Sequence, residues 1–359
     1  MEKYEQRIRE VLRRQNFIVG EREEDIIARR IRNGRRYFFM TAMRQEKDGT
    51  RERFVKIPRN DSKKLLIPFR RQLHITQYIQ KRKGLLKTRA VIASNANPRQ
   101  GIPYAVMETF PIHTSKIGFI EDNDEIRSLR ARHGQKIVRQ LHDFHNIRAE
   151  KLPRALQRTL VPYVKTYPRM RQQIFRYVYK KMRTEEFRRF RNPVIATMLS
   201  RRLGEPAVKE KIRSVFDRLS ESMKRQDDLG HRALVQGDMS PKNLYVFDNG
   251  EVEFLDFEWA GYTGSRALAE VIDLGNLRAR SWNNSEFQNA LDEAYRNLYS
   301  EKGEEFLGKA IVALAILRSS ILLIGFFENY SGDRRDMPEE TQKRNVIEND
   351  IARILAMDI

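Results

Sequence analysis

Two short polar motifs, joined by a predicted hairpin, constrain this sequence more than any other feature. Residues 236–243 read QGDMSPKN, and residues 252–258 form an apolar run that ends in LDFE. The Asp-Asn-Gly sequence at residues 248–250 predicts a tight turn between them, so Asp256 returns beside Asn243. A carboxylate and an amide oxygen are ligands that Mg²⁺ accepts in proteins, together with water and phosphate oxygens. The pattern therefore predicts a magnesium site at Asn243 and Asp256.

A third side chain, Asp238, lies five positions before Asn243. This is the spacing of the catalytic loop of protein kinases, in which the Asp accepts the proton of a hydroxyl group. The spacing alone arises by chance about once in a chain of this size, whereas the spacing combined with the hairpin and the Asp-Phe strand end is far rarer. The alternative is purely structural, with Asp238 capping a helix and Asp256 closing a strand end.

At residues 236–243 and 255–258 the sequence resembles the aminoglycoside phosphotransferase and choline kinase family, the small-molecule branch of the protein-kinase-like fold. The family's first motif usually begins His-Gly-Asp, so Gln236 replaces a histidine, and we expect this change to affect packing more than chemistry. The resemblance implies an ATP- and Mg²⁺-dependent phosphotransferase that acts on a hydroxyl group of a small molecule, with Asp238 as the catalytic base. A kinase that acts on proteins is disfavoured, because no Ala-Pro-Glu segment follows Asp256.

The same resemblance implies a nucleotide site in the N-terminal part of the chain. Lys56, in the run FVKI, matches the strand lysine that contacts the α- and β-phosphates. Gly34 lies where a phosphate-covering loop is expected, and Glu108 ends the strand that leads to the adenine-binding hinge. Gln72 stands where the acidic partner of Lys56 is expected, and a neutral amide cannot form an ion pair. Either Gln72 is wrongly aligned with the acidic residue of the family, or another group holds Lys56.

The pattern of apolar residues predicts an α+β, two-lobed protein-kinase-like fold. We expect a helical N-terminal extension over residues 1–30, followed by an N-terminal lobe over residues 31–112 with a β-sheet and one helix at residues 65–82. Residues 113–359 are expected to form a larger, mostly helical lobe that carries the catalytic loop and a basic helical insert at residues 151–226.

Positive charge is concentrated in this insert. The whole chain has a net charge of +21, and residues 151–226 contain 21 Lys and Arg against 6 Asp and Glu, a net charge of +15. A basic surface disfavours a cationic acceptor and favours a neutral or anionic one, such as a sugar or a phosphorylated metabolite. The alternative function is a catalytically weakened module that binds RNA or an anionic membrane through the insert. A generally basic protein surface without a partner explains the charge equally well.

Four further features limit the possible functions. The chain has no cysteine, which excludes disulfides and thiolate chemistry, and its charged N-terminus lacks a signal-peptide pattern, so we expect a cytoplasmic protein. The apolar run at residues 310–327 contains Arg318 and predicts a buried helix rather than a membrane span. His142 and His145 lack further ligands in the sequence, so we expect packing or solvated roles rather than metal binding.

Overall fold

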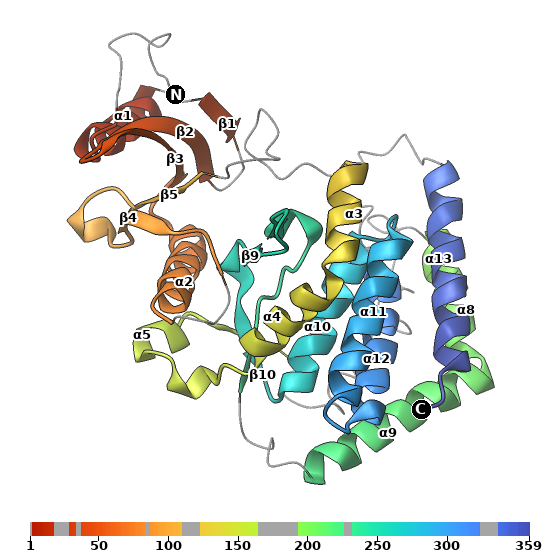
Figure 1. Cartoon of the computed structure of the whole chain (residues 1–359). Helices are drawn as coiled ribbons and strands as arrows, with labels where there is room; N and C mark the ends of the chain where they lie inside the picture. Colours follow the sequence, from red (N-terminus) through yellow and green to blue (C-terminus); the bar gives the residue numbers. More distant parts are fainter. Residues whose placement is uncertain are drawn as a thin grey trace.

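The N-terminal part of the chain is built around one antiparallel sheet (Figure 1). The computed structural model describes residues 2–17, 29–33, 37–82, 87–109, 123–163, 193–225, 232–323 and 337–359. The sheet has the order β1-β2-β3-β5-β4. Its strands are β1 (Arg29–Asn33), β2 (Tyr37–Glu46), β3 (Gly49–Pro58), β4 (Val91–Asn95) and β5 (Tyr104–Glu108). Strands β2 and β3 form a hairpin, and β4 pairs with β5.

Two helices cover this sheet, α1 (Glu2–Arg14) and α2 (Lys63–Gln80). Side chains of α1 pack in one buried cluster with Val106 of β5, whereas Phe69 and Leu73 of α2 pack in another cluster with Ala105 and Met107. Successive residues of a strand point to opposite faces of the sheet. The helices α1 and α2 therefore lie on opposite faces, and the sheet is protected from water on both sides.

The expected helix over residues 1–30 is wrong at its C-terminal end. Helix α1 ends at Arg14, and residues 29–33 form the strand β1, which pairs with β2. Residues 18–28 and 34–36 lie outside the described residues, so the predicted phosphate-covering residue Gly34 does too. It falls between β1 and β2 in the sequence.

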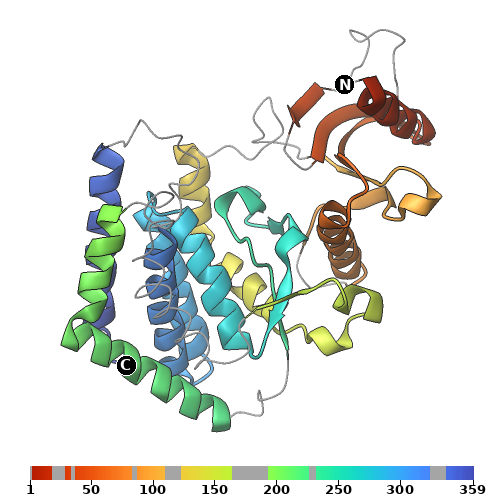
Figure 2. The same cartoon turned by 180° about the vertical axis from the view of Figure 1, so that it is seen from behind.

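The C-terminal part is mostly helical (Figure 2). Its helices are α3 (Asp124–Arg132), α4 (Gly134–His145), α5 (Arg154–Gln157), α8 (Pro193–Gly204), α9 (Pro206–Arg225), α10 (Arg266–Arg280), α11 (Ser285–Ser300), α12 (Glu305–Leu323) and α13 (Met337–Ala356). Helices α3 and α4 meet at Gly134. A Cβ atom at Gly134 would lie 3.0 Å from the Cβ of Ala290, so the glycine permits the close approach of α11.

Helix α12 forms the centre of the helical lobe. Within the described part of the chain it is the one helix long and apolar enough to cross a membrane, but 78% of its apolar window is buried inside the protein. It packs against α10, α11 and α13. This packing is that of a core helix, as the sequence predicted. Residues 164–192 and residue 226 of the basic insert lie outside the described residues.

Short strands carry the two sequence motifs into the space between the lobes. The pair β8 (Leu244–Val246) and β9 (Val252–Phe254) forms the predicted hairpin, and Gly250 in its turn has a φ of 78°. A second small sheet has the order β6-β10-β7, with β6 (Val161–Pro162), β7 (Ala233–Val235) and β10 (Gly261–Thr263). Strand β7 leads into the first motif, and β9 leads into the second.

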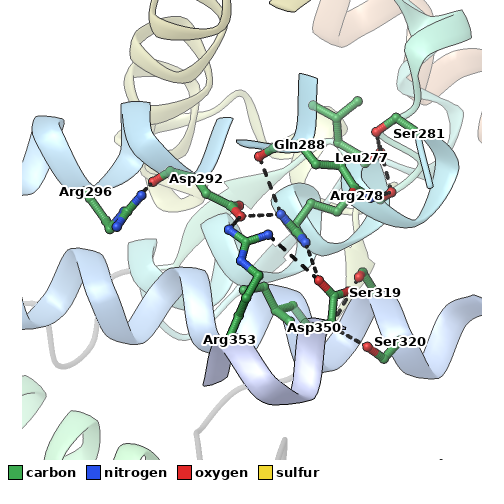
Figure 3. A network of polar contacts seen from close by, with 11 residues as sticks. Leu277, Arg278, Ser281, Gln288, Asp292, Arg296, Ser319, Ser320, Asp350 and Arg353 are labelled. Carbon is green, nitrogen blue, oxygen red and sulfur yellow. Dashed lines mark hydrogen bonds and ion pairs between the residues drawn. The ribbon is translucent and has the colours of Figure 1, made fainter. Parts of the chain in front are cut away.

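A buried ionic network fixes the C-terminal helix to this lobe (Figure 3). Arg278 of α10, which is fully buried, pairs with Asp292 of α11 and donates a 2.9 Å hydrogen bond to Asp350 of α13. Arg353 contacts Asp292 at 2.7 Å. Burial raises the pKa of Asp350 to about 6, although the charge of Arg278 opposes this shift. Buried charges are tolerated only when they are paired, so the network depends on all of its members.

Candidate active site

Helix α10 holds the backbone of the first motif. The buried carboxylate of Asp273 accepts hydrogen bonds from the backbone N–H groups of Gln236 at 2.7 Å and Gly237 at 2.9 Å. The side-chain amide of Asn276 donates to the carbonyl of Gly237 at 3.0 Å. His145 of α4 contacts the same Asp273 carboxylate at 2.9 Å through Nε2. These bonds fix the loop that presents the next residue, Asp238.

The side chain of Gln236 joins the two motifs. It is completely buried, and its Oε1 accepts a hydrogen bond from the backbone N–H of Asp238 at 2.8 Å. Its Nε2 donates to the carbonyls of Leu255 at 3.1 Å and Asp256 at 2.8 Å. Both ends of the amide are therefore used, and the position supports the loop without touching the space where a substrate would react.

The three polar residues of the motifs lie together, as the hairpin predicted. Asn243 donates through Nδ2 to the carbonyl of Asp238 at 2.8 Å, and its own carbonyl accepts from the N–H of Leu255 at 2.9 Å. Asp256 has a φ of 52°, a left-handed conformation that is uncommon outside glycine and clusters at functional sites. Asp256 lies shortly after the end of β9 and at the start of a one-turn helix that its side chain does not cap. The side chain of Asp238 contacts Arg280.

The donor set at Asn243 and Asp256 fits Mg²⁺. The Oδ1 atom of Asp256 is buried and makes no hydrogen bond within the described residues. The ammonium of Lys56 lies 3.8 Å from this atom, too far for a hydrogen bond, so the oxygen still has lone pairs that a metal cation can use. The Nδ2 of Asn243 donates to a carbonyl, and its amide oxygen is a second ligand of the kind that Mg²⁺ accepts.

Lys56 reaches this cluster from the opposite lobe. Its side chain is buried, and its Nζ donates to Oε1 of Gln72 at 2.5 Å, forms an ion pair with Glu258, and lies 3.8 Å from Oδ1 of Asp256. It also lies 4.2 Å from the ring centre of Tyr37. Gln72 therefore does lie beside Lys56, as its alignment predicted, and Glu258 is a second group that holds the lysine. Sequence analysis did not predict Glu258 as the carboxylate partner, although this residue is part of the LDFE motif.

Arg71 connects α2 to the second motif. Its guanidinium donates to the backbone carbonyls of Glu258 and Thr159, and burial lowers its pKa. On the other side of the motif, the hydroxyl of Tyr163 donates to the carbonyl of Trp259 at 2.8 Å, and burial raises the pKa of this tyrosine well above its usual range. These contacts place Lys56 and the motif residues in one continuous, hydrogen-bonded structure.

The carboxylate of Asp238 is partly open to solvent. Its side chain is 38% exposed, and Oδ1 lies 3.4 Å from Nη2 of Arg280 at the C-terminal end of α10. A solute hydroxyl can therefore reach the carboxylate, which a general base requires.

The predicted adenine contact at Glu108 is only partly described. Glu108 ends β5 as expected and is exposed, but its backbone N–H already donates to the carbonyl of Ala90 at 3.1 Å. Any contact with an adenine edge from this residue would have to use its carbonyl. Residues 110–122, which follow β5, lie outside the described part of the chain.

The two histidines of α4 serve buried hydrogen bonds. His142 contacts Glu270 at 2.6 Å through Nδ1, and the hydroxyl of Tyr299 donates to the other oxygen of Glu270 at 2.5 Å. Burial alone would raise the pKa of Glu270, but the hydrogen bond and charge of His142 hold it below its usual range. Over the residues that the structure describes, no group of three or more His, Asp or Glu side chains could hold a metal ion. His142 and His145 thus both make buried contacts with carboxylates of α10.

Comparison with known proteins gives structural matches only. No protein-family model and no curated protein sequence matches the chain. A crystal structure of a thermostable mutant of aminoglycoside phosphotransferase APH(4)-Ia, in a ternary complex with ADP and hygromycin B, is similar over 97% of each chain, with 9% identity and a TM-score of 0.51. The GDP complex of aminoglycoside 2'-phosphotransferase-IIIa covers 98% of each chain at 12% identity, with a TM-score of 0.49. An ethanolamine kinase from Plasmodium vivax covers 96% of this chain and 92% of its own, at 14% identity and a TM-score of 0.46. The match at a TM-score of 0.51, together with the β-sheet lobe and the helical lobe described above, shows that the chain has the two-lobed α+β, protein-kinase-like fold.

Proposed function

We propose that this protein is a phosphotransferase that moves the γ-phosphate of ATP, with Mg²⁺, to a hydroxyl group of a small molecule. The observation that carries the proposal is the meeting of Lys56 from one lobe with Asp256 from the other, next to Asn243 and Asp238. A buried amine, a carboxylate oxygen without a hydrogen-bond partner and a solvent-open carboxylate are the groups that phosphoryl transfer uses.

Each residue has a distinct role in this proposal. Lys56 contacts the phosphates as a positive charge, and Asn243 and Asp256 would hold Mg²⁺, which neutralises charge on the β- and γ-phosphates. Asp238 orients the acceptor hydroxyl and accepts its proton while the hydroxyl oxygen forms its bond to the γ-phosphorus. The bond between the γ-phosphorus and the bridging oxygen breaks, and ADP leaves with that oxygen. Gln236 keeps the two motifs in register during the reaction.

Two further observations concern the nucleotide and the acceptor. The structure at a TM-score of 0.51 holds ADP and hygromycin B, which agrees with a nucleotide site beside a small-molecule site. The net charge of +15 over residues 151–226 favours a neutral or anionic acceptor over a cationic one. We place this activity in the cytoplasm, as the sequence suggests.

Thermal unfolding with Mg·ATP tests the nucleotide site. Mg·ATP should raise the melting temperature of the wild type, because a ligand that binds only the folded state stabilises it. The shift should disappear in Asp256→Ala and persist in Asp124→Ala, which removes a fully exposed carboxylate on α3. If Mg·ATP shifts neither the wild type nor the control, the proposed function is wrong.

The alternative function, binding of RNA or an anionic membrane through residues 151–226, stays a prediction. The middle of this segment lies outside the described residues. Its signature would be an affinity for RNA that falls steeply with salt, since released counterions drive such binding. Salt-independent affinity would exclude it.

A further inference from the structure

One face of α10 is directed at the catalytic loop. Asp273, Asn276 and Arg280 follow one another at spacings of three and four residues, which places them on the same side of a helix. Asp273 and Asn276 bind backbone groups of the loop, as described above. Arg280 is the next residue on this face, and its Nη2 lies 3.4 Å from Oδ1 of Asp238, the proposed catalytic base.

Arg280 differs in its surroundings from the neighbouring arginine on the same helix. Arg278 is fully buried and paired with Asp292 and Asp350, so its charge is committed to the fold. The side chain of Arg280 is 47% exposed and touches Asp238 at a distance longer than a strong charge-assisted hydrogen bond. A solute that approaches Asp238 therefore meets the guanidinium of Arg280 at the same time.

We propose that Arg280 determines acceptor specificity by binding an oxyanion, a phosphate or carboxylate group, on the hydroxyl compound that is phosphorylated. This inference rests on the proposed function, in which the acceptor hydroxyl must lie within hydrogen-bond distance of Asp238. Groups a few bonds away from that hydroxyl then lie beside Arg280. An oxyanion there gains charge-assisted hydrogen bonds from the planar guanidinium, whereas an ammonium group meets a like charge. The net positive charge of the chain also favours an anionic acceptor, because it raises the local concentration of anions.

A panel of matched acceptors tests this assignment. Transfer from γ-labelled ATP would be measured to ribose 5-phosphate, glucose 6-phosphate and glycerate, to their uncharged counterparts ribose, glucose and glycerol, and to the cationic alcohols choline and ethanolamine. We expect the wild type to prefer the anionic member of each pair. In Arg280→Ala this preference should fall about 10- to 100-fold, mainly through KM, because one charge-assisted contact is lost. Arg280→Lys should restore part of it.

The control is Arg139→Ala. Arg139 forms an exposed ion pair with Glu301 at the same 3.4 Å distance, with both side chains 54% exposed, and it lies on α4. This variant should keep the anionic preference. A wild-type preference for neutral or cationic members would overturn the assignment of Arg280. So would an Arg280→Ala variant that loses activity equally with charged and uncharged acceptors, since Arg280 would then act on Asp238 or on the transferred phosphoryl group.

A second measurement covers the case in which no panel member is phosphorylated. The same compounds would be tested as inhibitors of Asp238-dependent transfer to a metabolite extract. The inference requires stronger inhibition by the anionic members and loss of that difference in Arg280→Ala; equal inhibition by both kinds of compound overturns it. Failure of the proposed function looks different, because the Mg·ATP shift and Asp238-dependent transfer would then both be absent.

Discussion

Glu258→Gln removes the carboxylate that pairs with the buried amine of Lys56 while keeping the shape of the side chain. Lys56 is 3% exposed, so its charge would be left between two neutral amides, with Asp256 3.8 Å away as the remaining carboxylate. Breaking a buried ion pair from one side costs about 3 to 5 kcal/mol. Because Asp256 compensates in part, we expect the free energy of unfolding to fall by about 3 kcal/mol, the lower end of this range.

The expected change in melting temperature follows from the length of the chain. An unfolding entropy of about 2 cal/mol/K per residue gives about 1.3 °C for each kcal/mol in a chain of 359 residues. Calorimetry should therefore show a decrease of about 4 °C for Glu258→Gln. Saturating Mg·ATP should reduce this difference, because phosphate oxygens then supply negative charge to Lys56.

The control for this experiment is Glu301→Gln, which breaks the exposed ion pair with Arg139 and should cost less than about 1 kcal/mol. A Glu258→Gln protein that is as stable as the control would refute the claim that Glu258 holds the charge of Lys56. A loss of stability that Mg·ATP leaves unchanged would refute the contact between Lys56 and the phosphates.

Two further predictions concern the loop and the helical lobe. Gly237→Ala should lower both transfer activity and melting temperature. Gly237 has a φ of 85°, and a Cβ atom there would overlap Tyr163 and the carbonyl of Trp259. The control for backbone strain alone is Gly303→Ala, because Gly303 has a φ of 70° and open space around it. Asp350→Asn should change the pH dependence of stability. Since burial raises the pKa of Asp350 to about 6, the folded state retains a proton that the unfolded state releases, and the free energy of unfolding falls as pH rises from about 4 to 6. This contribution amounts to about 3 kcal/mol, and urea denaturation across this range should show a smaller decrease in the variant; equal slopes would contradict the raised pKa.

Local patterns made much of the fold predictable. The hairpin at β8 and β9 follows from two short, mainly apolar runs and an Asp-Asn-Gly turn, both of which act within a few residues. Strand β1 was not predicted, and the reason is again local to the segment. Its sequence RRIRN is charged because it lies at the edge of the sheet, and edge strands with charged side chains lack the usual apolar pattern.

The candidate site was predictable where its residues belong to recognisable motifs, which include Lys56 in the run FVKI. Asp238, Asn243 and Asp256 belong to two adjacent motifs, whereas Glu258 lies 202 positions from Lys56 and meets it through the packing of the two lobes. The roles of Asp273 and Asn276 likewise depend on the position of α10 behind the loop. The available sign of these roles in the sequence was two polar residues three positions apart in a mainly apolar helix. That spacing does not reveal which loop the residues bind.

The most direct test of the account is transfer of the γ-phosphate from labelled ATP to a metabolite extract. The wild type and Asp124→Ala should form the same labelled product, and Asp238→Ala should form it roughly 100- to 10,000-fold more slowly while still binding Mg·ATP, because a general base contributes a factor of this size. A product formed by Asp238→Ala at the wild-type rate, or no Asp238-dependent product from any fraction of the extract, would contradict the proposed phosphoryl transfer.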